Sequence, residues 1–406
     1  MRRLIIENIG PIKHVDLELA KVNVFVGPQG AGKSTLAKII SFCSWLEKHS
    51  SDDSVFLDAA SKLKSYHRLA SYFNPDSQIY YQGEDIIYCY GWDKEQISMP
   101  ERFENANVLS PNEKETIWFA IGKSVNPKVI YIPAERNFVA SVPNLQDYME
   151  DADSLQGFVV DWYNAKRRYT SSTPLPVLDL DVRFYSSDNT PDSLMLKNGT
   201  PVPLAASASG YQSLIPILTV VDWLSSGIYK TNKPFSPSEH EKIMSTLEDI
   251  RSQQSVEELE QLKKRLVGFI EGKIYTHTQF VIEEPEQNLF PQTQKDLVYY
   301  LVSALDHGKN HHLVMTTHSP YILSALNNLL YAHKVAQQDK KELVCDIIPE
   351  SSWLDFKQTR AYFVNDGVVS GIMDEETGMV SAETIDSISD TLNREFEQLL
   401  DIEYRS

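Results

Sequence analysis

Four continuous hydrophobic runs, each ending in or followed by glycine or polar residues, set the framework of the chain. They are residues 22–26, 128–132, 279–286 and 312–317. Short apolar runs bounded by turn or polar residues are typical of buried strands. Helical patterns follow at residues 35–47, at 294–305 and from Pro320 onward. This alternation predicts an α/β fold built on an open sheet.

Segments of alternating polarity predict further strands. Residues 4–8 and 15–19 flank a turn at Gly10-Pro11 and predict a small antiparallel layer beside the loop that follows residue 26. A hairpin is expected over residues 194–204, because Asn198-Gly199 suits a type I′ turn. Other strands are expected at residues 177–182, 344–348 and 361–364.

A second predicted hairpin, residues 79–82 and 86–90, is rich in tyrosine. Such a surface could stack nucleic-acid bases. A tyrosine-rich sheet packed against the core is the favoured interpretation.

Helical patterns dominate the middle and the end of the chain. They cover residues 143–170, 214–224, 239–271 and 382–400. In the third segment Leu259, Leu262 and Leu266 fall on one helical face. The segment is too short for a coiled-coil arm, so we expect a helical layer.

Composition narrows the class of protein. The 406 residues fit roughly two to three domains or one elaborated α/β domain. The net charge of −18 argues against a general nucleic-acid coat protein, although the basic clusters at 166–168 and 263–265 leave room for a local groove. Cys43, Cys89 and Cys345 are too far apart for a zinc or disulfide framework. No apolar run approaches the ~20 residues of a membrane helix, so we expect a cytoplasmic protein with no membrane partner.

Candidate chemistry begins at Gly27–Ser34, which has the P-loop form of glycine, four residues, glycine, lysine and serine. A predicted strand leads into it and a predicted helix leads out, as the motif requires. Backbone amides can curl around phosphate oxygens, Lys33 can reach the terminal phosphates and Ser34 can hold Mg²⁺. A chance glycine-rich turn is the alternative, and the flanking elements make it much less favoured.

Three later segments carry polar residues at strand or helix ends. Ser209 and Gly210 open a helix, Glu283 and Glu284 directly follow Phe-Val-Ile, and His318 ends a strand before Ser-Pro. The alternatives are a simple helix cap, an exposed acidic turn and a structural histidine. Because the carboxyl ends of strands build the site of an open α/β sheet, a functional site is favoured for each. The charged turn at residues 134–136 could also collect ligand contacts or be a surface turn.

The ordered set of motifs resembles an ABC-type ATPase of the branch that includes SMC and RecF heads. It is most similar to stand-alone AAA family ATPases related to OLD-family and Septu-type bacterial defence ATPases. The resemblance is carried by residues 8–12, 27–34, 207–212, 282–286 and 316–320. It implies an α/β P-loop NTPase with a mixed sheet, an N-terminal antiparallel β layer and an inserted helical subdomain. The implied division of the single head is 1–135, 136–272 and 273–406.

The resemblance also implies a head that dimerises around two ATP molecules. Glu284 would be the general base and His318 a switch that senses the γ-phosphate. Glu283 and Ser34 would support Mg²⁺, and Ser209 and Gly210 of one subunit would close on the nucleotide of the other. The implied nucleotide-binding residues are Gly27, Gln29, Gly30, Ala31, Gly32, Lys33, Ser34, Thr35, Ser209 and Gly210.

The sequence departs from the family pattern at several points. Gln29 replaces the usual asparagine, Glu283 replaces the usual aspartate, and residues 207–212 loosen the LSGGQ signature. Gln78, Gln82 and the turn at 134–136 are all candidates for the Q-loop. The absence of a long coiled-coil pattern and of a Toprim-like acidic cluster argues against SMC function and a fused nuclease.

The resulting hypothesis is an ATP-hydrolysing switch that controls a separate effector, such as a nuclease or toxin, or DNA engagement in anti-phage defence. A RecF-like DNA-repair ATPase, a nucleotide-binding subunit of a transporter and a non-hydrolysing scaffold are the alternatives. The negative charge weighs against the RecF-like role, and the lack of an early adenine-stacking aromatic weighs against the transporter subunit. Intact Lys33, Glu284 and His318 weigh against the non-hydrolysing scaffold.

Overall fold

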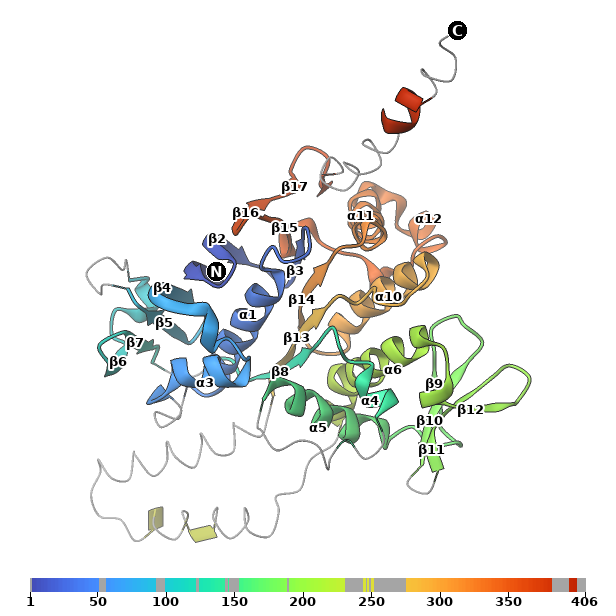
Figure 1. Cartoon of the computed structure of the whole chain (residues 1–406), viewed down its shortest axis with the longest axis horizontal. Coiled ribbons are helices and arrows are strands. Elements are labelled where there is room, and N and C mark those ends of the chain that lie inside the picture. The colour runs from blue at the N-terminus through green and yellow to red at the C-terminus, as the bar shows by residue number, and fades with distance from the viewer. Residues whose placement is uncertain are drawn as a thin grey trace.

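The computed structural model describes most of the chain (Figure 1). The described residues are 2–50, 56–92, 99–121, 124–142, 145, 153–187, 190–230, 244–245, 247, 250–251, 275–381 and 394–399.

One large mixed sheet of twelve strands runs through the described part of the molecule. Its strand order is β6 (Asn107–Asn112), β7 (Glu115–Phe119), β5 (Ile86–Tyr90), β4 (Phe73–Gln82), β1 (Arg2–Ile9), β2 (Ile12–Leu19), β16 (Val368–Gly371), β15 (Thr359–Asn365), β3 (Val22–Val26), β14 (His312–Thr317), β13 (His277–Glu283) and β8 (Pro127–Ile132).

The sheet has two halves with different pairing. Strands β6, β7, β5, β4, β1 and β2 pair antiparallel. Strands β15, β3, β14, β13 and β8 pair parallel. Strand β16 joins the halves, since it pairs antiparallel with β15 and parallel with β2. The α/β class, the mixed sheet and the N-terminal antiparallel layer predicted from the sequence are therefore confirmed.

Helices cover both faces of the parallel half, because its strands are apolar on both sides. In β3, Val24 faces a core that contains α5 (Ser154–Lys166), α6 (Ser209–Asp222), α10 (Pro291–Ser303) and α11 (Pro320–Val335). The next residue, Phe25, faces the opposite core with α1 (Lys33–Lys48). Helices α1 and α6 thus lie on opposite faces of β13 and β14 (Figure 1).

The remaining elements are short. A small sheet has the order β12 (Pro201–Pro203), β11 (Thr190–Met195), β10 (Arg183–Ser187) and β9 (Leu175–Pro176), and β17 (Met373–Asp374) pairs with β18 (Met379–Val380). The short helices are α3 (Ala59–Tyr66), α4 (Phe138–Ser141), α7 (Ile228–Lys230) and α12 (Lys341–Cys345). The small sheet lies within residues 136–272, the part of the chain that the family resemblance implies to be a helical subdomain.

Both predicted hairpins are confirmed. Leu194 pairs with Val202 across the Asn-Gly turn, and β4 pairs with β5. The tyrosine-rich hairpin belongs to the core, because Tyr81 and Tyr88 are buried. Base stacking by these two rings is therefore excluded.

Two predicted strands are wrong. Residues 177–182 form a turn in which Leu178 and Asp181 have positive φ angles of 47° and 52°, and Val177 N–H donates to the Val182 carbonyl. Residues 344–348 continue the last turn of α12, and the Ile348 N–H donates to the Val344 carbonyl. In each segment the apolar residues at the two ends reach the core through a turn rather than an extended strand.

The helix expected at 143–170 is shorter, because α5 spans only residues 154–166. The helical segment expected at 239–271 falls mostly outside the described residues, as does most of 143–153. Of the segment expected at 382–400, only residues 394–399 are described, and these are helical. The three-part division at residues 135 and 272 stays a prediction. Among the described residues, no helix is long and apolar enough to cross a membrane.

Trp162 is the largest fully buried side chain and joins α5 to the small sheet, where its ring lies 5.8 Å from that of Phe184. We expect Trp162→Ala to lower the free energy of unfolding by about 3–5 kcal/mol. Trp162→Phe should cost clearly less, because the buried indole N–H has no hydrogen-bond partner among the described residues. Urea denaturation monitored by circular dichroism measures both. Tyr331→Ala, on an exposed position of α11, is the control, and equal losses for all three would contradict the packing role.

Buried histidines predict a loss of stability in mild acid. Burial lowers the pKa of His67 to about 3, with Lys38 adding to the shift. The folded chain then binds fewer protons than the unfolded chain, so stability is complete above pH ~6.5 and falls with pH toward the folded value, by up to ~1.4 kcal/mol per pH unit. His67→Phe should reduce the slope of unfolding free energy between pH 7 and 5. Trp162→Phe should shift the whole curve without changing that slope. An unchanged slope in His67→Phe would refute the assignment.

Candidate nucleotide-binding and hydrolysis site

The P-loop connects the end of β3 to the start of α1. Gly27 follows the strand so closely against β15 that an added Cβ would lie 2.0 Å from the Val364 carbonyl oxygen. Gly32 caps α1 with φ 109°, a conformation that side chains rarely adopt. These two positions explain why the loop needs glycine before and after its exposed turn. Helix α1 begins at Lys33, so its free backbone amides point toward the loop.

Lys33 is buried, and its ammonium group is held by its own loop. The Nζ atom donates to the carbonyls of Gly27 and Pro28, both at 2.9 Å. Burial lowers the pKa of Lys33, while the attraction of Glu284, Glu286 and Glu283 opposes the shift.

The adjacent Ser34 is exposed, and Thr35 is buried in the first turn of α1. Gln29 and Gly30 are also exposed, whereas Ala31 and Gly32 are buried.

Glu283 ends β13 with a buried carboxylate beside the start of α1. Burial raises its pKa, and the Tyr131 hydroxyl, the Lys38 charge and the Ser34 hydroxyl oppose that rise. Its Oε1 atom has no hydrogen-bond partner among the described residues. A buried oxygen without a partner, next to a serine hydroxyl, fits a hard cation such as Mg²⁺. Glutamate in place of aspartate is therefore compatible with a metal at this point.

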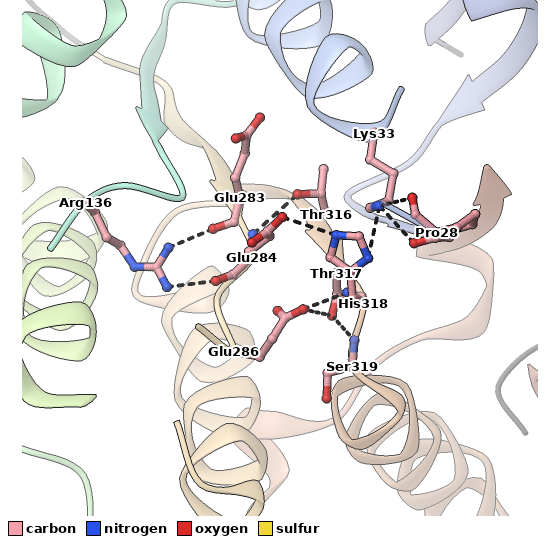
Figure 2. Close-up of polar contacts among 11 residues, drawn as sticks. Pro28, Lys33, Arg136, Glu283, Glu284, Glu286, Thr316, Thr317, His318 and Ser319 are labelled. Atoms are coloured by element: carbon pink, nitrogen blue, oxygen red, sulfur yellow. Dashed lines mark hydrogen bonds and ion pairs between the residues drawn. The ribbon is translucent and has the colours of Figure 1, made fainter. Parts of the chain in front are cut away.

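Glu284 turns sharply out of β13 with φ 42°, in the left-handed region. Its side chain points to His318, with Glu284 Oε1 and His318 Nε2 3.2 Å apart. The other ring nitrogen, Nδ1, lies 3.4 Å from Lys33 Nζ. A histidine protonated on Nε2 donates to Glu284 and accepts from the lysine. Three residues predicted from separate motifs thus form one chain of contacts (Figure 2).

Glu286 was left without a role by the sequence, and the structure gives it a contact. Its Oε1 atom accepts from Thr317 Oγ1 at 2.8 Å and from the His318 backbone N–H at 2.7 Å. Glu286 therefore fixes the backbone that carries His318. The Glu-Glu-Pro-Glu spacing was the available signal.

Arg136 is fully buried, and its guanidinium donates to main-chain carbonyls (Figure 2). Two of them belong to Glu283 and Glu284, each at 2.8 Å. Neither earlier interpretation of the turn at 134–136 fits this residue, because it is not on the surface and contacts backbone instead of facing a ligand. Glu135 is exposed, as in a surface turn.

The other Q-loop candidates, Gln78 and Gln82, make hydrogen bonds within the antiparallel half of the sheet. Gln78 donates to the Gly91 carbonyl, and Gln82 accepts from the Tyr80 hydroxyl.

Ser209 and Gly210 begin α6, on the opposite face of the sheet from α1. Ser209 is exposed, and a Cβ added at Gly210 would lie 3.0 Å from the Asn288 carbonyl oxygen. The structure places these residues against the segment that follows Glu284 instead of against their own P-loop.

Two protein families match the sequence. The model described as "AAA domain" matches residues 3–158, and the model described as "AAA ATPase domain" matches residues 238–323. No curated protein matches the chain.

Among solved structures, the chain is similar to an SMC head domain from Thermotoga maritima at 10% identity, covering 91% of this chain and 97% of that chain, with a TM-score of 0.38. An SMC head with an extended coiled coil from Pyrococcus furiosus, bound to the C-terminal domain of ScpA, shows 10% identity, 97% and 100% coverage and a TM-score of 0.37. The ADP conformation of an ATP-binding cassette of an ABC transporter shows 10% identity, 93% coverage of both chains and a TM-score of 0.33. All three TM-scores are below 0.5, so these similarities carry no argument about the function of this chain.

The P-loop motif and the mixed sheet are those of an α/β P-loop NTPase fold, and the two matched segments are similar to AAA ATPase domains. The roles of its individual site residues remain predictions.

Tyr131 is a buried neighbour of Glu283 that the sequence did not single out. Tyr131→Phe removes the buried hydroxyl that lowers the pKa of Glu283, so the carboxylate should be protonated more of the time. We expect the Mg²⁺ concentration for half-maximal ATP turnover to rise about tenfold, the range for partners of metal ligands, and more at pH 6.5 than at pH 8. Tyr362→Phe removes a bond to the Glu18 carbonyl and is the matched control. Equal responses of the two variants would contradict the prediction.

Proposed function

We propose that the protein is an ATP-binding and ATP-hydrolysing switch that closes as a homodimer around two nucleotides. The observation that carries the proposal is a division of the site. Lys33, Glu284 and His318 are in contact, whereas Ser209 and Gly210 lie on the other face of the sheet. A second copy of the chain can bring its own Ser209 and Gly210 to a nucleotide that the first copy holds.

In the proposed site, the backbone amides of Gly27 to Thr35 and the Lys33 ammonium bind the phosphates. Ser34 and Glu283 would hold Mg²⁺, which when bound neutralises phosphate charge. Glu284 accepts the proton of the attacking water, as a general base. His318 orients that carboxylate through its Nε2 and faces the phosphate end of Lys33 through its Nδ1.

The output of the switch is proposed to be control of a separate effector protein, such as a nuclease or toxin, in bacterial anti-phage defence. This part rests on the resemblance of the motifs alone. Direct engagement of DNA is less favoured, because the net charge is −18. Duplex binding that weakens steeply with salt would favour DNA over the effector.

The first experiment is the solution mass of Glu284→Gln with and without ATP and Mg²⁺. The amide cannot accept a proton, so ATP should bind without turnover and hold the closed state. We expect ATP to convert a smaller species into a dimer. Ser209→Arg in the same background should prevent the conversion while each chain still binds ATP.

A monomeric Glu284→Gln protein with bound ATP would overturn the homodimer. If the protein is already dimeric without nucleotide, the comparison becomes ATP turnover of Ser209→Arg against wild type. Full turnover by Ser209→Arg would then overturn the role of the partner's helix α6.

A further inference from the structure

Arg136 is buried, and within the described part of the chain every acceptor of its guanidinium is a main-chain carbonyl. The distances are 3.2 Å to Pro133, 2.8 Å to Glu283, 2.8 Å to Glu284, 3.3 Å to Pro285 and 3.0 Å to Ser213. These carbonyls come from three segments: the end of β8, the turn after β13 and the first turns of α6.

Stability alone is a weak reason for such an arrangement. A buried charge is expensive to desolvate, and well-packed apolar residues often stabilise a fold equally well. A planar guanidinium, however, can direct several N–H groups at fixed angles. Its contacts therefore define the orientation of peptide groups, which an apolar side chain would not do.

The peptide groups that Arg136 holds are those of the proposed catalytic turn. Glu284 has φ 42°, which a side chain other than glycine adopts only where its surroundings impose it. Arg136 binds the carbonyl before this residue and the carbonyl of the residue itself, while the Glu284 N–H donates to the Thr316 carbonyl at 2.9 Å. The direction of the Glu284 side chain toward His318 follows from these backbone contacts.

The same guanidinium reaches α6. Its Nε atom donates to the Ser213 carbonyl, and Asn288 Nδ2 donates to Ser213 Oγ at 2.9 Å. Asn288 lies four residues after Glu284. Ser213 in α6 is thus bonded both to Arg136, which holds the Glu284 turn, and to Asn288, which follows that turn. The same helix carries Ser209 and Gly210 at its start.

We propose that Arg136 is a positioning residue that holds Glu284 in the orientation for hydrolysis and transmits a displacement of α6 to that carboxylate. The inference rests on the proposed function. In a closed dimer, contact of α6 with the partner's nucleotide would then influence hydrolysis in the subunit to which α6 belongs.

The test compares Arg136→Met and Arg136→Lys with wild type. Turnover is divided by the number of ATP-binding sites measured by equilibrium dialysis, and the ATP dissociation constant and melting temperature are measured in parallel. We expect kcat per binding site to fall about 10²-fold in Arg136→Met, because small misplacements of reacting groups have effects of this size. The dissociation constant should stay within a small factor of the wild-type value. Arg136→Lys, which keeps the charge without the planar fork, should lie between the two.

Arg102→Met is the matched control. Arg102 donates to the buried carboxylate of Asp85 at 2.7 Å in a region away from the P-loop, so its loss should lower the melting temperature without lowering kcat per binding site. Wild-type kcat per binding site in Arg136→Lys would overturn the inference. If Arg136→Met does not fold, Arg136→Lys and Asn288→Ala decide.

The connection to α6 is tested by a double-mutant cycle of Arg136→Lys and Asn288→Ala. Both side chains hold Ser213, so their effects on kcat should be smaller together than the product of the separate effects. Independent, multiplicative effects would overturn the transmission through α6. Absence of ATP turnover in the wild-type protein would instead refute the proposed function, so the two failures are distinguishable.

Discussion

Parallel pairing of β3, β14 and β13 is the constraint on which the site depends. Glu283 is in register with Thr316, and Thr317 with Val26, so the three strands end at nearly the same level. Residues that directly follow those ends must then lie close together. This is why Gly27, Glu284 and His318, from three distant parts of the sequence, share one edge of the sheet. A shift of one strand by two residues would separate them.

The part of the site that the sequence predicts is the part that local chemistry specifies. Gly27–Ser34, Glu283, Glu284 and His318 each stand at the end of a strand whose hydrophobic run is visible in the sequence. Secondary structure was less certain where the apolar spacing fits two geometries. Val344 and Ile348 are four residues apart, which suits a helical turn, although the β-rich composition between them suggested a strand.

Arg136, Glu286 and Tyr131 could not be assigned from the sequence, for a physical reason. Arg136 binds main-chain carbonyls up to 149 residues away, and carbonyls are present at every position, so no motif marks the partner. Tyr131 appears in the sequence only as one residue of an apolar strand. Its contact with Glu283 depends on β8 pairing beside β13. The resemblance named the expected roles of Ser209 and Gly210, but only the fold shows that α6 and α1 are on opposite faces.

The carbonyls that hold the Lys33 ammonium group affect both the binding and the release of nucleotide in the proposed site. Gly27 and Pro28 provide acceptors where phosphate oxygens would otherwise serve. Binding therefore exchanges one set of hydrogen bonds for another, and a net gain is smaller than the count of phosphate contacts suggests. By the same logic, departure of product does not leave a buried cation without acceptors. In the proposed nucleotide site, these carbonyls therefore favour repeated binding and release over permanent retention of the ligand.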